Sequence, residues 1–347
     1  MKILGIETSC DETSAAVVRE TGDAARPWAI DSNVIASQVP IHREWGGVVP
    51  ELASRQHIRD ICGVVDRALE DAHATWPDLG AIAVTQGPGL VGSLLIGVAF
   101  AKAAAAAAGL PLVAVHHLAG HIESLVLQNG EIELPAVVLV VSGGHTSLYH
   151  VERPGHYVLV SRTRDDAAGE AYDKVAKLVG LGYPGGPIID RLAQKGDDRA
   201  VRLPTTRLTH ADRNAPELKG DLDFSFSGLK TAVARYVREH RTLSEQEVAD
   251  LCASFQRTVV AVLVERLFDA ARRFQARSVG IAGGVSANSR LRADLRARGA
   301  ARDVPTFMPS LALSTDNAAM IAAAGLRRFR AGVLAPEDLN PDASLPL

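Results

Sequence analysis

The sequence VAVHHLAGHIE, residues Val113–Glu123, joins an apolar, strand-like run to two successive histidines and to a third histidine four residues later. His117 and His121 stand at positions i and i+4, so on a helix their side chains project from one face, one turn apart. Two imidazoles at that spacing can bind one divalent metal ion. A solvated or core-packed histidine pair is the alternative, and spacing alone does not decide between them.

The best candidate for a third ligand is Asp316 in SLALSTDNAAMIAAA, where a strand-like FMPSLAL run meets the start of an apolar helix. Two histidines and one carboxylate form a facial triad that leaves coordination positions open for substrate. Such a triad favours iron(II), with zinc as the alternative. Helix capping is the other role open to Asp316, because Thr315, Asp316 and Asn317 all suit a helix N-terminus.

Length and composition indicate an ordinary globular chain. Its 347 residues predict two domains, or two lobes around a cleft. A net charge of -3 gives no general attraction to nucleic acid, so RNA binding would need local basic patches. Two arginine clusters are interpreted as solvated helix faces in preference to RNA contacts. The first is Arg290, Arg292, Arg296 and Arg298, and the second is Arg327, Arg328 and Arg330.

Three scattered cysteines, Cys10, Cys62 and Cys252, form no C-x-x-C pair and fit a reducing cytoplasm. The N-terminal apolar run is cut by Glu7, which argues against a signal peptide. The Ala-rich segment 103–108 follows Lys102, and we expect no membrane-spanning run and no membrane partner.

The first half of the chain opens with alternating strands and a long helix. We expect an antiparallel meander of strands at Met1–Thr8, Ser14–Arg19 and Asn33–Val39. A long amphipathic helix follows, with Pro50 in its first turn. Its apolar stripe is predicted as Leu52, Ile58, Ile61, Val65 and Leu69.

After a strand at Ala81–Thr85, Gly87, Gly89 and Gly92 match the dinucleotide pattern G-x-G-x-x-G. That pattern needs an acidic residue about 20 positions further on to hold the ribose. No Asp or Glu occurs between Leu90 and Ile122, so NAD binding is disfavoured.

The second half begins like the first. Ala136–Val141 is an apolar strand, SGGHT a tight turn, and Ser147–Val151 a returning strand. ETSCDETS and SGGHTS are therefore equivalent polar turns at the heads of two hairpins. This repeated order predicts two similar lobes.

Further along, the segment DDAAGEAYDKVAKLVG is predicted to form a helix with Asp166, Glu170 and Asp173 on one face. A second helix is predicted to begin at Pro187 and to contain Asp190. The remaining predicted elements are helices at Phe224–His240 and Ser244–Phe274, strands at Ser278–Ala282 and Val304–Met308, the turn GGVSAN, and a loop-rich tail after Gly332. Glycines at a strand-to-helix turn suit phosphate binding.

Seven motifs, in order over nearly the whole chain, together resemble the TsaD family: ILGIETSCDETS, HHLAGH, VSGGHTSL, DDAAGEAYDK, YPGGP, GGVSAN and STDNAAM. The resemblance implies an α/β fold of two duplicated lobes, of the actin, Hsp70 and sugar-kinase (ASKHA) type, around a nucleotide cleft. The lobes would be residues 1–131, completed by the helix 315–332, and a nucleotide-binding lobe 132–310, with a tail at 333–347.

The family transfers a threonylcarbamoyl group from threonylcarbamoyl-adenylate to N6 of the adenosine beside the anticodon in tRNAs that read codons beginning with A. The resemblance implies that t6A forms and that AMP leaves. It makes His117, His121 and Asp316 the metal ligands. The residues implied to contact the adenylate are Val140, Val141, Ser142, Gly143, Gly144, Asp173, Gly186, Asp190 and Asn288.

The metal would stabilise negative charge on the carbamoyl oxygen as a Lewis acid. Asp11 and Glu12, in the first polar turn, are the carboxylates we expect to take the amine proton, with simple turn chemistry as their alternative role.

Two other functions compete with this one. A metallopeptidase would fit the family's older glycoprotease label, but Leu118 stands where the H-E-x-x-H motif needs glutamate. A non-catalytic ASKHA scaffold would lack the triad, which this chain keeps.

The segment Gly92–Gly109 is apolar or small around nearly its whole circumference, so as a helix it must be buried on more than one side. Burial within the lobe is one explanation, and docking of a partner is the other. The resemblance favours docking, because family members pair through the first lobe with a TsaB-like paralogue and also require a TsaE-like ATPase.

Overall fold

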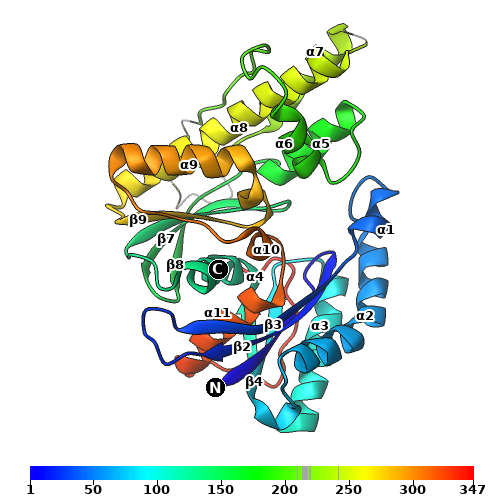
Figure 1. The fold of residues 1–347 in the computed structure, drawn as a ribbon, viewed down its shortest axis with the longest axis vertical. Helices are drawn as coiled ribbons and strands as arrows, with labels where there is room; N and C mark the ends of the chain where they lie inside the picture. Colours follow the sequence, from blue (N-terminus) through cyan, green and yellow to red (C-terminus); the bar gives the residue numbers. More distant parts are fainter. Residues whose placement is uncertain (209, 213–217, 219, 241) are drawn as a thin grey trace. The chain divides into compact units, whose positions relative to one another are not determined.

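The computed structural model describes residues 1–208, 210–212, 218, 220–240 and 242–347 (Figure 1). Contacts between Cα atoms divide the chain into two compact units. The first unit is Met1–Ile132 with Pro309–Leu347, and the second is Glu133–Met308.

A mixed five-stranded sheet forms the centre of the first unit, with strand order β3-β2-β1-β4-β5. Its strands are β1 (Lys2–Glu7), β2 (Glu12–Glu20), β3 (Trp28–Ser37), β4 (Leu79–Gly87) and β5 (Leu112–His116). The first three strands are antiparallel, which confirms the predicted meander, and β4 and β5 continue the sheet parallel to β1.

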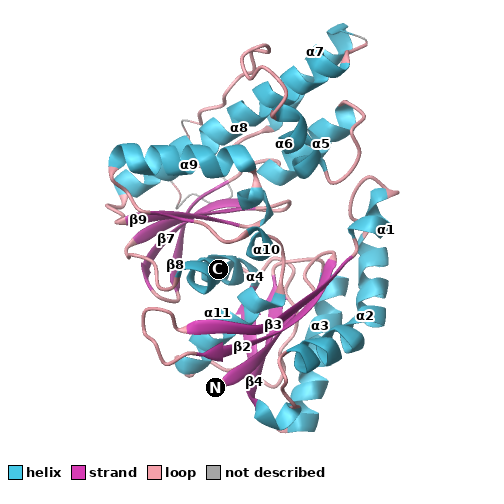
Figure 2. Ribbon diagram, in the orientation of Figure 1, coloured by secondary structure: helices cyan, strands magenta, loops and turns pink. Residues whose placement is uncertain are grey.

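Helices cover both faces of this sheet (Figure 2). They are α1 (Val39–Arg43), α2 (Pro50–Asp71), α3 (Val91–Ala108), α4 (His117–Asn129), α10 (Leu311–Ser314) and α11 (Ala318–Arg330), with the short 3-10 turn η1 (Trp76–Asp78). Strand β1 shows why both faces need cover: Leu4 packs in the core under α2 and α3, whereas Ile3 packs under α11. Successive side chains of a strand point to opposite faces, so an all-apolar strand requires two layers of helices.

Helix α2 begins at Pro50 as predicted, and its predicted stripe is buried at Ile61, Val65 and Leu69, but only partly at Leu52 and not at Ile58. Ile58 is 60% exposed, whereas its neighbour His57 is fully buried. The stripe runs through Ala53, His57, Ile61, Val64, Val65, Ala68 and Leu69. A histidine therefore occupies a core position that the hydrophobic pattern assigned to isoleucine.

Helix α3 corrects the expectation that no run is long enough for a membrane. Its 18 residues are long and apolar enough to cross one by composition, because the run starts at Val91 and contains a single charge. Val98, Ala101 and Ala105 nevertheless pack in the core against the sheet. The same features are found in core helices of globular proteins, and burial of this face agrees with that role.

The glycines of the G-x-G-x-x-G match serve close packing. A Cβ atom on Gly89 would lie 2.6 Å from the carbonyl oxygen of Ser9, and one on Gly92 would lie 2.5 Å from Ser54 Oγ. A Cβ on Gly87 would overlap the backbone of Asp342. Contact with neighbouring chain segments thus explains all three glycines without a dinucleotide.

The second unit repeats the topology of the first. Its strands are β6 (Ala136–Val141), β7 (Thr146–Arg153), β8 (His156–Arg162), β9 (Ser278–Ala282) and β10 (Thr306–Phe307), in the order β10-β9-β6-β7-β8. Like β1, β6 is antiparallel to the following strand and parallel to the strand after the helical insertion. This duplication confirms the predicted class of two similar α/β lobes.

Six helical segments complete this unit: α5 (Ala168–Leu178), α6 (Gly185–Ala193), α7 (Ser227–His240), α8 (Glu245–Arg273), η2 (Gly284–Ala287) and α9 (Ser289–Arg302). Ser244 and Glu247 form a capping box that starts α8. The predicted stripe of α8 is buried at Leu251, Phe255, Val259, Leu263 and Leu267, and only partly at Val248.

Several predicted boundaries in the second unit were wrong. Asp166 lies before α5, not within it, and its carboxylate binds Lys174 and Lys230. Helix α7 starts at Ser227 instead of Phe224, because Asp165 accepts the backbone N–H groups of Phe226 and Ser227. Helix α6 starts at Gly185, ahead of Pro187.

The segment around FMPSLAL also differs from its prediction. Only Thr306–Phe307 pairs as a strand, and Leu311–Ser314 is a short helix. The strand is short because the register with β9 covers just two residues.

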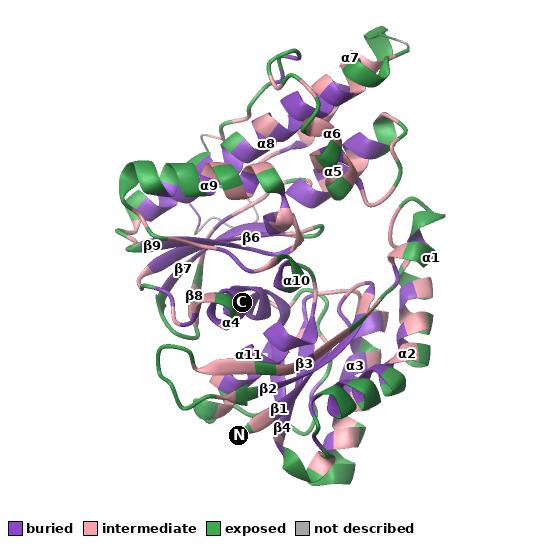
Figure 3. Cartoon of the chain, viewed as in Figure 1, coloured by how far each residue is buried: buried purple, intermediate pink, exposed green. Residues whose placement is uncertain are grey.

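Residues 333–347, which the sequence separates as a tail, pack against the first unit. The N–H of Ala335 donates to the carbonyl of Leu112 at 2.8 Å, and the N–H of Asp342 donates to that of Gln86 at 2.9 Å. Leu339 is buried in the core under α2 and α3. Figure 3 shows the distribution of buried residues along the sheets and the inner faces of the helices.

Candidate metal centre and substrate residues

His117, His121 and Asp316 lie together in the first unit. Their ligand atoms are all within 4.8 Å of one another. Asp316 Oδ1 is 3.6 Å from His117 Nε2 and 3.2 Å from His121 Nε2. Both histidines begin α4 and share one face, as their spacing predicted. Asp316 follows His121 by 195 positions in the sequence, so it is the folding of the chain that brings the carboxylate to the two histidines.

Both ring nitrogens of His121 are buried, and neither has a hydrogen-bond partner among the described residues. The contact of Nε2 with Asp316 is close enough for an ion pair, but its alignment is not that of a hydrogen bond. A buried imidazole without partners costs free energy unless something coordinates it. Two nitrogens and a carboxylate oxygen are a donor set that fits iron(II) or zinc.

Capping by neighbouring residues leaves these three side chains available for the cluster. Asn317, not Asp316, caps α11, because its side chain accepts the N–H of Met320 at 3.1 Å. His116, not His117, caps α4: its Nδ1 accepts the N–H of Leu118 at 3.1 Å. Asp316 therefore does not have the capping role considered for it, and His117 does not cap α4.

Sequence reasoning missed Glu7. This carboxylate is fully buried at the end of β1 and lies 3.0 Å from His117 Nδ1. Thr85 Oγ1 donates to it at 2.7 Å, and so does the backbone N–H of Ser9. Carboxylates that hold the second nitrogen of a ligand histidine fix its tautomer and orientation. One signal was available: a single acid at the end of an otherwise apolar strand, KILGIE.

The charges of this cluster shift the pKa values of its members. Burial alone would lower the pKa of His117, but the neighbouring carboxylates Asp316 and Glu7 raise it to about 9. Burial lowers the pKa of His121. Burial would raise the pKa of Glu7, yet His117 holds it below its usual value. The two carboxylates and His117 thus favour each other's charged forms.

Packing of α4 on α11 brings the histidines to the aspartate. A Cβ on Gly120 would lie 2.8 Å from Ile321 Cδ1, so the two helices approach closely there. At their other ends, Arg327 binds both oxygens of the buried Glu123, at 2.6 and 3.0 Å, and also Glu131 at 2.9 Å. The two histidines thus lie on α4, and Asp316 lies two residues before α11, a helix that ion pairs tie to α4.

Several arginines in the two predicted clusters are paired with carboxylates. Arg327 binds Glu123, and Arg330 binds Glu20. Arg290 binds Asp198 and Asp294. These pairings agree with helix faces satisfied by the protein's own charges.

Asp11 lies in the polar turn after β1, and Glu12, predicted in the same turn, is the first residue of β2. Asp11 is 7% exposed, and Glu12 accepts a hydrogen bond from Ser37 Oγ at 3.2 Å. Burial, and then the charges of Asp11 and Asp316, raise the pKa of Glu12 well above its usual value. Ser9, in the same segment, places its Oγ 3.2 Å from His117 Nδ1, so this segment begins beside the cluster.

In the second unit, the turn after β6 presents the predicted phosphate-binding glycines. Gly143 and Gly144 are exposed, and a Cβ on either would meet open space. The turn is anchored at Ser142, whose carbonyl accepts the N–H of Gly169 at 3.1 Å. Val140 and Val141 are fully buried in the sheet, so their side chains support the turn.

Asp173 and Gly186 lie at a second turn of this unit. The Oδ1 atom of Asp173 accepts the N–H of Gly185 at 2.7 Å and so fixes the YPGGP segment. A Cβ on Gly185 would lie 2.7 Å from the carbonyl oxygen of Tyr172, whereas one on Gly186 would meet nothing. Only Gly186 has open space for a ligand beside its Cα.

Asp190 and Asn288 belong to one hydrogen-bonded chain through Gln256, which sequence reasoning did not identify. Gln256 Nε2 donates to Asp190 at 3.0 Å, and its Oε1 accepts from Asn288 at 2.8 Å. Asn288 also caps α9 by accepting the N–H of Leu291, and Asp190 accepts the hydroxyl of Ser289. These side chains shape the start of α9, so contact with a ligand is not their only role.

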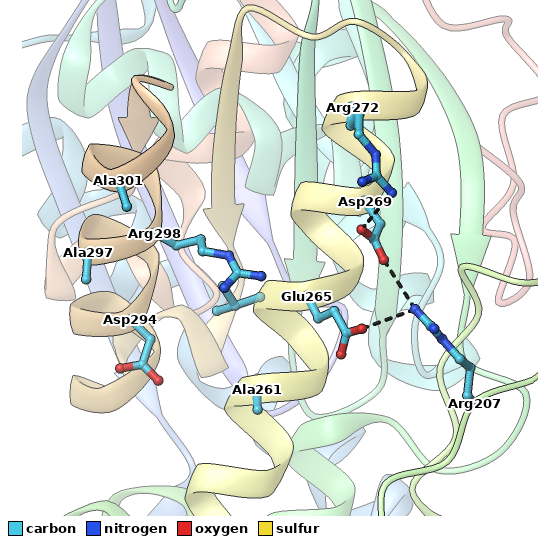
Figure 4. A pocket seen from close by; sticks show the side chains of 10 residues that line it. Arg207, Ala261, Glu265, Asp269, Arg272, Asp294, Ala297, Arg298 and Ala301 are labelled. Carbon is cyan, nitrogen blue, oxygen red and sulfur yellow. Dashed lines mark hydrogen bonds and ion pairs between the residues drawn. The ribbon is translucent and has the colours of Figure 1, made fainter.

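A groove of about 600 Å³ lies elsewhere in this unit, between α8, α9 and Arg207 (Figure 4). Its charges pair with one another: Arg207 binds Glu265 at 3.1 Å, and Arg272 binds Asp269 at 3.2 Å. None of the predicted site residues lines it. We therefore do not assign the substrate to this groove.

Fold and site together define a duplicated two-lobed α/β protein whose first unit contains a His-His-Asp cluster that could hold a metal ion. A family model described as tRNA N6-adenosine threonylcarbamoyltransferase, TsaD, matches residues 29–323. The chain belongs to the TsaD family and is accordingly a transferase that threonylcarbamoylates tRNA.

Curated relatives support the assignment over the full length. The chain is 52% identical to the tRNA N6-adenosine threonylcarbamoyltransferase of Anaeromyxobacter dehalogenans strain 2CP-C, with 98% of each chain covered. It is 48% identical to that of Koribacter versatilis, covering 99% of this chain and 98% of the relative.

Solved structures support the fold. Full-length HypF aligns with a TM-score of 0.58 at 12% identity, over 95% of this chain and 55% of HypF. Component A of the (R)-2-hydroxyglutaryl-CoA dehydratase of Acidaminococcus fermentans aligns with a TM-score of 0.52 at 14% identity, over 94% and 98% of the two chains. These likenesses confirm the predicted ASKHA-type fold.

Proposed function

We propose that this enzyme transfers the threonylcarbamoyl group of threonylcarbamoyl-AMP to N6 of the adenosine 3′ of the anticodon, in tRNAs that read codons beginning with A. The products are t6A and AMP, and the reaction takes place in the cytoplasm. The observation that carries the metal-assisted part of this proposal is the cluster of His117, His121 and Asp316: within the described part of the chain, the buried Nδ1 of His121 has no hydrogen-bond partner, and its Nε2 meets Asp316 at 3.2 Å.

The triad is proposed to hold one iron(II) ion, with zinc as the alternative. Three protein ligands leave further coordination positions to substrate. When bound, the ion supplies Lewis-acid polarisation of the carbamoyl carbonyl. Glu7 orients the imidazole of His117 through Nδ1.

The second unit is proposed to bind the adenylate. The N–H groups of the exposed Gly143–Gly144 turn can donate to the phosphate, and the open space beside Gly186 admits the nucleotide. Asp173 and Asp190 offer carboxylate acceptors for ribose hydroxyls. Val140, Val141 and Asn288 support these groups from within the fold.

In the transfer step, the adenosine amine forms a bond to the carbamoyl carbon, and the bond from that carbon to the AMP phosphate oxygen breaks. The amine must lose a proton. Asp11 or Glu12 is proposed to accept it, since general-base help is typically worth about 10²- to 10⁴-fold. Their segment joins β1 to β2 and begins beside the cluster, which supports this role.

A metallopeptidase reaction is disfavoured by the geometry of α4. Leu118 follows the first ligand histidine, where the zincin motif needs a glutamate to activate water. Absence of chelator-sensitive peptidase activity is expected. A non-catalytic scaffold is ruled out by the family assignment and by retention of all three ligand side chains.

A TsaB-like paralogue is proposed to dock on the first unit, and a TsaE-like ATPase to act with the pair. Helix α3 has an exposed apolar stripe through Val91, Leu95, Ala99 and Ala103. Gly92 packs against Ser54 of α2, and Ile58, one turn further along α2, is also exposed. Exposed apolar surface of this kind is typical of protein interfaces.

The decisive experiment combines anaerobic metal analysis with a transfer assay on unmodified tRNA. His117→Ala, His121→Ala and Asp316→Ala should each abolish metal binding and transfer while circular dichroism shows a folded chain, because open metal sites sit on a preformed scaffold. Full transfer by a metal-free triple variant would contradict the metal-assisted mechanism.

A further inference from the structure

Helix α2 carries a fully buried histidine, His57, in its core-facing stripe. Its Nε2 lies 3.0 Å from the carbonyl oxygen of Cys10, and its Nδ1 lies 2.8 Å from Thr13 Oγ1. A carbonyl can only accept, so Nε2 carries the proton and Nδ1 accepts from the Thr13 hydroxyl. Both polar atoms of the ring therefore bind a single short segment of the chain.

That segment contains Asp11 and Glu12. Cys10 precedes the two carboxylates and Thr13 follows them, so His57 bonds to both ends of the pair. Gln38 adds a third contact, since its N–H donates to the carbonyl of Asp11 at 2.9 Å. The turn is thus held to α2 and to the residue that opens α1, through its backbone.

The opposite side of the turn is held by the start of α3. The N–H of Leu90 donates to the carbonyl of Ser9 at 2.8 Å, and Thr8 Oγ1 donates to that of Ser93 at 2.9 Å. The turn cannot shift without breaking bonds to one helix or the other.

A histidine at this core-facing position of α2 needs an explanation, because an apolar side chain would pack there without requiring hydrogen-bond partners. Buried polar groups cost about 1–3 kcal/mol each when left unpaired. Burial lowers the pKa of His57, which keeps the ring neutral in the tautomer described above. Both ring nitrogens bind the segment, and Nδ1 also lies 3.5 Å from Nε2 of Gln38, a residue that itself binds the backbone of Asp11. These contacts indicate that the role of His57 is to place the segment.

We propose that His57 is a positioning residue for the transfer reaction: from α2 it fixes the Cys10–Thr13 backbone and so holds the carboxylates of Asp11 and Glu12 in place. The inference rests on the proposed function, in which these carboxylates accept the amine proton. The ring of His57 itself faces the turn and needs no contact with substrate.

The test compares two amide substitutions in the full chain, assayed with its partner proteins. The longer amide of His57→Gln can still donate to Cys10, whereas the shorter one of His57→Asn cannot reach it. His57→Asn should lower kcat by about 10- to 100-fold, since small misplacements of a reacting group have effects of this size. KM for threonylcarbamoyl-AMP and metal content should stay unchanged, and His57→Gln should restore most of the rate. His73→Asn, at an exposed position just after the end of the same helix, is the control.

A double-mutant cycle separates positioning from a merely structural role. In an Asp11→Asn/Glu12→Gln background, His57→Asn should cause no further loss of kcat, because the groups it positions are already gone. An equal fold-loss in both backgrounds would overturn the inference. If His57→Asn does not fold, Thr13→Val removes only the hydroxyl and must show the same non-additivity. Full activity of the Asp11→Asn/Glu12→Gln variant would instead refute the general-base assignment, and the inference with it.

Discussion

Glu7 connects the strand that begins the fold to the metal ligands. It is buried, accepts from Thr85, and contacts His117 through the nitrogen that faces away from Asp316. A carboxylate in this position increases the basicity of the ligand imidazole and prevents its rotation. The exact identity of residue 7 should therefore matter to metal binding although it is not itself a ligand.

We predict that Glu7→Gln weakens metal affinity by about 10- to 100-fold, because outer-shell partners of ligand histidines have effects of this size. The measurement is an anaerobic iron(II) titration of chelator-stripped protein. Glu51→Gln, an exposed carboxylate in the first turn of α2, should leave the affinity unchanged. Equal affinities for wild type and Glu7→Gln would show that the contact with His117 is unimportant for the metal.

Two adjacent glycines offer a second test at the scale of single residues. The φ of Gly186 is not positive and a Cβ there would meet open space, so Gly186→Val should fold normally. Any loss of binding then reports on ligand contact alone. We predict that Gly186→Val lowers affinity for a non-hydrolysable adenylate analogue by at least about tenfold, since a blocked contact of 1.4 kcal/mol has that effect.

Gly185→Ala is the matched contrast, because its Cβ would lie 2.6–2.8 Å from Ala176 Cβ, the carbonyl of Tyr172 and Asp173 Cα. It should lower the melting temperature, whereas Gly186→Val should not. Calorimetry and calorimetric titration with the analogue distinguish the two effects. Unchanged binding by Gly186→Val would remove this residue from the adenylate site.

At the scale of elements, the metal centre depends on how closely α11 packs on the sheet. A Cβ on Gly325 would lie 2.4 Å from Ala83 Cβ in β4, and one on Gly5 in β1 would lie 2.4 Å from the carbonyl of Ala318. Glycine at both points lets the helix lie directly on the strands. Because Asp316 immediately precedes α11, the position of the helix sets the position of the third ligand.

The same substitution in two helices should therefore have opposite effects. Gly325→Ala should lower the free energy of unfolding by about 1–3 kcal/mol, because an overpacked core must shift. Gly63→Ala, in α2 where a Cβ would meet nothing, should raise it by about 0.5–1 kcal/mol. Denaturant unfolding measures both, and metal affinity should fall only in Gly325→Ala. A stabilised Gly325→Ala protein would contradict the close packing.

At the scale of the whole molecule, function depends on a surface as well as a site. The end of α3 offers small exposed side chains at Ala103, Ala106, Ala107 and Ala108, whereas Ala104 is half-buried against the core. Ala107 is thus the position at which a change tests docking without disturbing the fold.

We predict that Ala107→Arg abolishes pairing with the TsaB-like paralogue, since a charge inside an apolar interface must be desolvated. The chain should remain a folded monomer. Light scattering of the mixed proteins measures the pairing, and Ala297→Arg, an exposed position on α9, serves as control. A purified chain that sustains repeated turnover on tRNA with no partner would contradict the docking proposal.

The sequence by itself determined the duplicated α/β fold and the residue types of the metal centre. Strand and helix periods are local properties of the chain, so β1, β6, α2 and α8 were predictable from which side chains must be buried. His117 and His121 were predictable for the same reason, because a spacing of four places them on one face of whichever helix forms.

Tertiary structure alone decided which of two adjacent residues caps a helix or faces the core, and which polar side chains contact each other. Whether Asp316 or Asn317 caps α11, whether His57 or Ile58 faces the core, and whether Glu7 meets His117 all depend on contacts between segments far apart in the chain. The predicted stripe of α2 is correct at Ile61, Val65 and Leu69, yet near the start of the helix a histidine takes the buried place that the pattern gave to isoleucine. Hydrogen-bond partners at such distances are fixed only when the helices pack, and a hydrophobic pattern carries no information about them.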